Sequence, residues 1–204
     1  MSHTKLIIFD LDGVLVDACE WHRLALNKAL KEVIDYEISD VQHEKTFNGI
    51  PTKVKLEVLT QMGVLRTEQH QLVYDKKQSY TVDMISEYGK IRHEKVDLIK
   101  YLKDQNIIVA CYTNSIRKTA KLMLERTGVY ELLDYVLTNQ DVAAPKPDAE
   151  GYNFLVNHFG VNTDECVIVE DSPKGKKAAY ASGCRVIEVD DPSFVNIEFL
   201  KDKI

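Results

Sequence analysis

The chain has 204 residues, of which 45% are hydrophobic and 28% are charged, and its formal net charge at pH 7 is −6. This balance is typical of a globular protein with one large domain, or one domain that carries an insert. The net negative charge argues against a nucleic-acid or acidic-membrane partner, and no stretch approaches the roughly 18 apolar residues of a membrane span.

The first predicted element is a buried strand over residues 6–9. This run is continuously apolar, as expected of a parallel strand that is covered on both faces. Asp10 and Asp12 follow directly, with Gly13 after them. Taken alone, such a segment could be an ordinary surface turn. A calcium-binding loop does not fit, because Trp21 stands at loop position twelve, where the glutamate ligand belongs.

An all-helical block interrupts the sheet pattern after this strand. The apolar periodicity predicts helices over residues 20–33, 39–47, 52–62 and 67–88, with a loop over residues 48–51. Along one stripe of the last of these helices lie Val73, Lys77, Tyr80 and Met84. A helical block in this place is typical of an inserted lid. We therefore predict a helical cap domain over residues 15–89 and a core domain over residues 1–14 and 90–204.

Strands and helices alternate again from about residue 92. Strands are predicted at residues 107–111, 135–137, 166–169 and 185–189, and helices at residues 149–159 and near 193–201. Gly128 is a good helix terminator, and Ser172 with Pro173 after it is a strong helix start. Alternation with right-handed crossovers predicts an α/β fold with a doubly wound, parallel, Rossmann-like sheet.

Chemically active side chains follow the predicted strands. Thr113 comes after the second strand, Lys146 lies in the loop after the third, and Glu170 and Asp171 follow the fourth. Each alone has an ordinary explanation: a turn hydroxyl, a solvated lysine, or carboxylates near a helix N-terminus. Because ligands of open α/β sheets bind at the carboxyl ends of the strands, their coincidence predicts one site. Two carboxylate pairs, a hydroxyl and a cation suit phosphoryl transfer, in which positioning and charge neutralisation supply most of the catalysis.

Four motifs occur in a fixed order along the chain. They are Asp10-Leu11-Asp12-Gly13-Val14, Thr113-Asn114-Ser115, Lys146-Pro147, and the segment from Glu170 to Cys184. Over nearly its whole length the chain resembles the haloacid dehalogenase superfamily, in the branch of phosphatases and β-phosphoglucomutase-like enzymes with a helical cap. The resemblance implies a Mg²⁺-dependent phosphatase that hydrolyses a small phosphorylated metabolite, of sugar-phosphate or phosphoglycolate type, through an aspartyl-phosphate.

The resemblance also implies a role for each motif residue. Asp10 would be the nucleophile, and Asp12 would act as general acid and then as general base. Thr113 would hold the phosphoryl oxygens, and Lys146 would neutralise charge between nucleophile and phosphate. The ligands of Mg²⁺ would be Asp10, the carbonyl of Asp12, Asp171 and, in support, Glu170.

Substrate choice is expected to depend on Asn114, His22, Lys76, Gly49 and Thr52. His22 and Lys76 match positions used by the β-phosphoglucomutase-like members; the alternative is that both are ordinary helix-surface residues. Thr52 stands where the mutase pattern has an arginine. A phosphomutase is therefore the alternative to a phosphatase. A receiver-like phosphoacceptor domain is a remote alternative, because such domains have no helical lid.

The remaining expectations concern redox state, location and partners. The cysteines lack metal-type spacing and are expected to be reduced; they are Cys19, Cys111, Cys166 and Cys184. We expect a cytoplasmic protein without a signal segment. Its partner would be a small-molecule phosphate ester, with neither nucleic acid nor membrane, and it would be a monomer or weak dimer.

Overall fold

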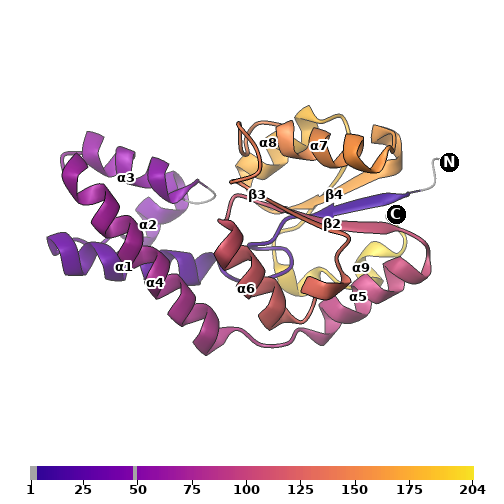
Figure 1. Ribbon diagram of the computed structural model, residues 1–204, viewed down its shortest axis with the longest axis horizontal. Helices are drawn as coiled ribbons and strands as arrows, with labels where there is room; N and C mark the ends of the chain where they lie inside the picture. The colour runs from indigo at the N-terminus through magenta and orange to yellow at the C-terminus, as the bar shows by residue number, and fades with distance from the viewer. Residues whose placement is uncertain (1–3, 48–49) are drawn as a thin grey trace. The chain divides into compact units, whose positions relative to one another are not determined.

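The computed structural model describes residues 4–47 and 50–204, and Figure 1 traces the chain from its first strand to its last helix. The chain divides into two compact units, one of residues 1–17 and 90–204 and one of residues 18–89. The boundary lies three residues beyond the predicted position. The reason is local, because Val14, Leu15 and Val16 are buried in the turn that follows the first strand.

The first unit contains a sheet of five parallel strands in the order β3-β2-β1-β4-β5. The strands are β1 (Leu6–Phe9), β2 (Ile108–Thr113), β3 (Tyr135–Thr138), β4 (Cys166–Glu170) and β5 (Arg185–Glu188). Helices lie on both faces of this sheet (Figure 1), so the central strand β1 is fully buried. The predicted doubly wound α/β fold is confirmed.

The register of the central strands decides which residues share an edge. Phe9 on β1 pairs with Cys111 on β2 and with Val169 on β4. The residues that follow these three in their strands therefore lie next to one another at the carboxyl edge of the sheet. Asp10 and Glu170 are brought side by side in this way, although 160 positions separate them in the sequence.

The helices of this unit are α5 (His93–Asp104), α6 (Arg117–Thr127), α7 (Glu150–Phe159), α8 (Pro173–Ala181) and α9 (Ile197–Leu200). Helix α8 begins as predicted, because the Ser172 hydroxyl accepts a hydrogen bond from the backbone N–H of Gly175. Two elements differ from the prediction by more than one residue. Strand β2 is displaced toward Thr113, and the predicted helix over residues 193–201 is divided, because the Asn196 side chain caps a new helix start.

The second unit is helical. Its elements are α1 (Cys19–Ile34), α2 (Asp40–Gln42), a π-helical turn over His43–Phe47, α3 (Thr52–Gln61), a 3₁₀ turn over Thr67–Gln69 and α4 (His70–Tyr88). The buried residues of α4 are Val73, Lys77, Thr81 and Ile85. The predicted stripe was wrong in its second half, because packing against α1 follows a row of residues four apart. No helix in the described part of the chain has the length and apolar character needed to cross a bilayer.

Candidate active site

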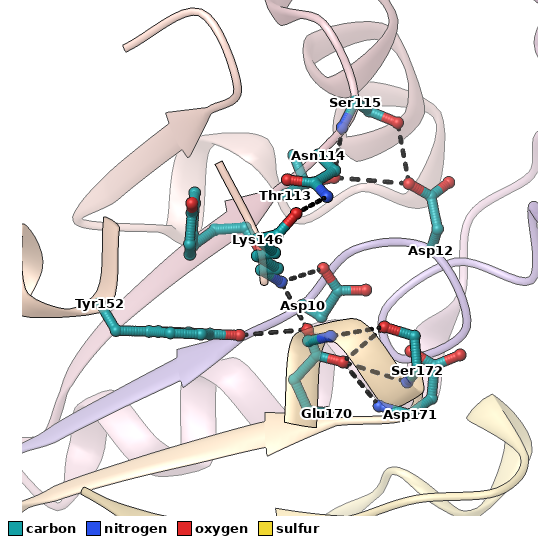
Figure 2. A network of polar contacts seen from close by, with 12 residues as sticks. Asp10, Asp12, Thr113, Asn114, Ser115, Lys146, Tyr152, Glu170, Asp171 and Ser172 are labelled. Carbon is teal, nitrogen blue, oxygen red and sulfur yellow. Dashed lines mark hydrogen bonds and ion pairs between the residues drawn. The ribbon is translucent and has the colours of Figure 1, made fainter. Parts of the chain in front are cut away.

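The carboxyl edge of the sheet gathers most of the predicted site residues (Figure 2). They are Asp10, Asp12, Thr113, Asn114, Lys146, Glu170 and Asp171. Figure 2 also shows Ser115, Tyr152 and Ser172 within the same network of polar contacts. The predicted cap residues belong to the helical unit and are described separately below.

Lys146 forms the centre of the network. Its ammonium donates to Asp10 Oδ1 at 2.6 Å, to Glu170 Oε1 at 2.5 Å and to the carbonyl oxygen of Tyr112 at 2.9 Å. These three bonds use all three N–H donors of a lysine. Burial by itself would lower the pKa of Lys146, but the charges of Asp10 and Glu170 outweigh it and hold the pKa above its ordinary value. Lys146 is therefore a fixed positive charge.

The position of Lys146 is also fixed by a hydrogen bond to its carbonyl and by two aromatic rings. The Asn114 side-chain nitrogen donates to the Lys146 carbonyl at 3.0 Å, and the Lys146–Pro147 peptide bond is cis. The ammonium lies 4.8 Å from the ring centroid of Tyr112 and 5.2 Å from that of Tyr152. Both distances lie in the range of cation–π attraction.

Glu170 is fully buried and accepts hydrogen bonds on both oxygens. Oε1 accepts from Lys146 and from the Tyr152 hydroxyl at 3.1 Å. Oε2 accepts from the backbone N–H groups of Asp171 and Ser172 at 3.0 and 3.1 Å, and from the Ser172 hydroxyl at 3.3 Å. A carboxylate offers about four lone-pair positions, so these donors occupy the acceptor capacity of Glu170. It organises its neighbours and has little capacity left for a metal.

Two glycines allow backbone to lie against these carboxylates. A Cβ atom on Gly175 would overlap the Glu170 carboxylate, and a Cβ on Gly13 would overlap that of Asp171. Gly13 also has a φ of +90°, which disfavours any other residue. The glycine of the first motif therefore serves both the turn and the acidic cluster.

Three carboxylates lie close enough together to share a cation. Oxygens of Asp10, Glu170 and Asp171 lie within 4.8 Å of one another. Burial and the charges of Glu170 and Asp12 raise the pKa of Asp171 to about 7. Burial also raises the pKa of Asp10 well above its ordinary value, because Lys146 opposes the effects of burial and of the neighbouring acids only in part.

The donor set fits a divalent cation. Asp171 Oδ1 is buried and has no hydrogen-bond partner among the described residues. Repulsion between acids and an acceptor without a donor are both relieved when a hard cation binds to carboxylate oxygens. Asp10 and Asp171 are the two carboxylates with capacity for this cation, since the lone pairs of Glu170 are engaged.

Asp12 lies apart from the lysine and is only partly buried. Its Oδ2 accepts a hydrogen bond from Ser115 Oγ at 2.8 Å and a longer one from Thr113 Oγ1 at 3.4 Å. The backbone N–H of Ser115 donates to Thr113 Oγ1 at 2.9 Å, which holds both hydroxyls in one turn. Thr113 and Ser115, from the second sequence motif, thus fix the carboxylate of Asp12, from the first motif.

In the helical unit, Lys76 pairs with a residue of α1. Lys76 forms an ion pair with Glu32 at 2.6 Å, and Glu32 also accepts from the Tyr80 hydroxyl. It is the neighbouring lysine, Lys77, that is buried and lies 3.1 Å from His22 Nδ1. Of the remaining predicted cap residues, Thr52 is the first residue of α3, and Gly49 lies outside the described residues.

Sequence reasoning missed three residues of these networks: Ser115 as the partner of Asp12, Tyr152 as a donor to Glu170, and Lys77 beside His22. The sequence could have indicated Ser115, because it carries a hydroxyl two positions after Thr113. It could also have indicated Lys77, because this residue shares a buried helix row with Val73. Nothing in the sequence indicated Tyr152, because only the packing of α7 on the sheet brings it to Glu170.

Comparison with known proteins places the chain among characterised relatives. Residues 7–189 match the family model described as haloacid dehalogenase-like hydrolase. The chain is 26% identical over 185 residues to the fructose-1-phosphate phosphatase YqaB of Escherichia coli, with 90% of this chain and 95% of that protein covered. It is 26% identical over 198 residues to β-phosphoglucomutase of Bacillus subtilis, with 91% and 83% covered.

A solved structure agrees with the fold. The crystal structure of β-phosphoglucomutase from Clostridium difficile superposes with a TM-score of 0.82 at 22% identity, covering 98% of this chain and 96% of that one. At this identity, the likeness concerns the architecture alone.

Proposed function

The chain belongs to the haloacid dehalogenase-like hydrolases, and on this basis we propose that it is a Mg²⁺-dependent phosphatase that hydrolyses a small phosphate ester through an aspartyl-phosphate. The observation that supports this most directly is the buried ion pair of Asp10 with Lys146 beside Asp171, whose Oδ1 has no partner among the described residues. We expect the substrate to be a sugar phosphate or a compound of phosphoglycolate type.

Asp10 is the proposed nucleophile. Lys146 binds Oδ1 of Asp10, which leaves the other carboxylate oxygen to attack the phosphorus. A bond forms from this oxygen to phosphorus while the bond from phosphorus to the ester oxygen breaks. The fixed positive charge of Lys146 favours the ionised form of Asp10, against the burial that raises its pKa, and it opposes the charge that develops on the phosphoryl group.

Asp12 is the proposed acid and base. It donates a proton to the departing ester oxygen and then accepts a proton from the water that hydrolyses the aspartyl-phosphate. Ser115 and Thr113 hold its carboxylate through Oδ2, which fixes the orientation of the proposed acid and base. Backbone N–H groups after Thr113 would bind the phosphoryl oxygens.

Asp10, Asp171 and the Asp12 carbonyl would hold Mg²⁺, with Glu170 in support from outside the coordination shell. When bound, Mg²⁺ would supply a positive charge that neutralises the phosphoryl oxygens. Glu170 contributes by fixing Lys146 on one side and the N-terminus of α8 on the other.

Substrate choice is proposed to depend on Asn114 and on residues of the helical unit. Asn114 Oδ1 is buried without a hydrogen-bond partner among the described residues, so it can accept a bond from a substrate hydroxyl. In the helical unit we now favour Lys77 with His22 over Lys76, because Lys76 is engaged by Glu32.

A phosphomutase is the second candidate, favoured by the likeness to β-phosphoglucomutase of B. subtilis. A mutase must grip a second phosphate of its substrate, for which the planar fork of an arginine is well suited. Thr52 is neutral, which argues for the phosphatase. A receiver-like domain is set aside, because the family match extends through the helical unit.

The test is a turnover screen with Mg²⁺ across sugar phosphates and phosphoglycolate, with inorganic phosphate as the readout. β-Glucose 1-phosphate with a bisphosphate activator is assayed in parallel for glucose 6-phosphate. We expect phosphate release from at least one ester and little glucose 6-phosphate. Faster isomerisation than phosphate release would instead establish the mutase.

A further inference from the structure

Two tyrosines pack edge to face beside Lys146, and they differ in one respect. Tyr112 comes from β2 and Tyr152 from α7; their ring centroids lie 5.0 Å apart at an interplanar angle of 88°, and both are fully buried. The Tyr152 hydroxyl donates to Glu170 Oε1. The Tyr112 hydroxyl has no hydrogen-bond partner among the described residues. Replacing either tyrosine with phenylalanine therefore removes one buried hydroxyl, and we expect the two replacements to change stability in opposite directions.

The Tyr152 hydroxyl is a permanent donor. Burial raises its pKa well above the ordinary value, and the charges of Glu170 and Asp10 add to this, although Lys146 opposes it. The Tyr152 hydroxyl and the Lys146 ammonium both donate to Glu170 Oε1 (Figure 2). One carboxylate oxygen thus has two donors, which approach it from different elements of the core.

The distance between Tyr152 and the sheet depends on the preceding residue of α7, Gly151. A Cβ atom on Gly151 would overlap the ring of Tyr112, so this helix can approach β2 only because residue 151 is a glycine. The close approach brings the Tyr152 hydroxyl to within 3.1 Å of Glu170. The contact is therefore built into the packing of the helix and does not depend on a flexible surface side chain.

We propose that Tyr152 is a positioning residue of the active site: its hydroxyl fixes the Glu170 carboxylate and, through Lys146, the orientation of Asp10. The inference rests on the proposed phosphatase function. Without this donor, Glu170 Oε1 would be bound by Lys146 alone, so this oxygen would be held less firmly, although Oε2 keeps its three donors. Lys146 would follow Glu170, and its bond to Asp10 would lengthen or bend.

The central experiment is Tyr152→Phe, which removes one oxygen atom from a buried ring. We expect kcat to fall by roughly tenfold, in keeping with loss of one hydrogen bond to a charged group. KM should stay within about twofold of the wild-type value, since Tyr152 does not touch the substrate. Tyr135→Phe is the matched control, because Tyr135 packs on Phe159 at the edge strand β3, outside the network.

Stability in chelator provides a readout that does not need catalysis. Tyr152→Phe should lower the thermal midpoint of the metal-free protein, and Tyr112→Phe should raise it by removing a buried hydroxyl without a partner. A double-mutant cycle of Tyr152→Phe with Glu170→Gln should show that the two changes are not additive. In Glu170→Gln the amide oxygen is expected to face the three donors at the Oε2 position, so its NH₂ group faces Tyr152 and cannot accept the hydrogen bond that Tyr152→Phe also removes.

Each result either supports or overturns the inference. A wild-type kcat in Tyr152→Phe, with or without a lower midpoint, would leave Tyr152 a packing residue only. Additive effects in the cycle would overturn the link to Glu170 whatever the activity. If the wild-type protein released no phosphate from any ester, the proposed function would fail, and the cycle would still decide whether Tyr152 holds Glu170.

Discussion

Replacing Lys146 with methionine should destabilise the metal-free protein strongly. The side chain is buried, and its ammonium lies 2.6 Å from Asp10 and 2.5 Å from Glu170. Removing one partner of a buried ion pair typically costs about 3–5 kcal/mol, because the remaining charge is left without compensation. Typical domains have a total stability of only about 5–15 kcal/mol. The expected loss is therefore about a fifth of the total or more.

The assay is urea denaturation in EDTA at pH 7, with the midpoint and the slope fitted separately. A fall in the midpoint without a change of slope indicates lost native stability. The matched control is Lys31→Met, which removes an exposed ion pair with Asp35 on α1. Its midpoint should stay close to that of the wild type, since exposed pairs contribute little.

The pH dependence gives the prediction a second check. The Asp171 pKa of about 7 in the folded protein lies above its ordinary value of 3.8. The folded protein therefore binds more protons than the unfolded chain between these values, and the associated stability, complete below pH 3.8, is lost as the pH rises through 7. Lys146→Met should steepen this loss, since the ammonium no longer offsets the acids.

The stability that Lys146→Met loses relative to the wild type should accordingly be smaller at pH 5 and larger at pH 8 than at pH 7. Added Mg²⁺ should recover part of it by binding the folded state. Equal midpoints for variant and wild type at pH 7 in EDTA would refute the reasoning. A deficit that grows toward pH 5 would do the same.

Three other changes test separate parts of the site. Asp10→Asn should reduce phosphate release below about a thousandth of wild type, because an amide does not attack phosphorus. Urea denaturation in EDTA should show a stability equal to the wild type or higher, because Lys146 keeps its ion pair with Glu170 and the repulsion of Asp10 by the neighbouring acids is removed. Chelation of metal should abolish turnover, and Asp171→Ala should raise the Mg²⁺ concentration for half-maximal rate; unchanged Mg²⁺ dependence would remove Asp171 from the ligand set. Gly175→Ala would stabilise an ordinary helix by about 1 kcal/mol, but it should destabilise this one, because the new Cβ overlaps the Glu170 carboxylate; a higher midpoint would contradict this.

The sheet and the centre of the site could be predicted because their signals are local. The apolar run of β1 stops at Asp10, and Glu170 directly follows an apolar run in β4. Topology then brings the two ends together at one edge. No knowledge of side-chain packing is needed for that step, only the rule that parallel strands share their carboxyl edge.

The remaining features depend on contacts that a sequence pattern does not contain. Lys76 and Lys77 differ by one position, yet one forms a surface ion pair and the other is buried beside His22. A helical periodicity gives the face of α4 only to within a residue or so. The hydrogen bond from Tyr152 to Glu170 depends on how closely α7 approaches the sheet. A glycine at position 151 permits this close approach, but the glycine alone does not predict it.

The pairing of β1 also shapes how the protein is made. This central strand is synthesised first, but its partners β2 and β4 are about 100 and 160 residues away along the chain. Contacts of such long sequence separation form slowly, because a large loop must close before they are gained. The helical unit of residues 18–89 lies between β1 and β2 in the chain. Its helices can therefore form during synthesis, before the strands that pair with β1 have been made. Asp10 thus gains both of its neighbours, Lys146 and Glu170, only after the 160 residues that follow it have been synthesised.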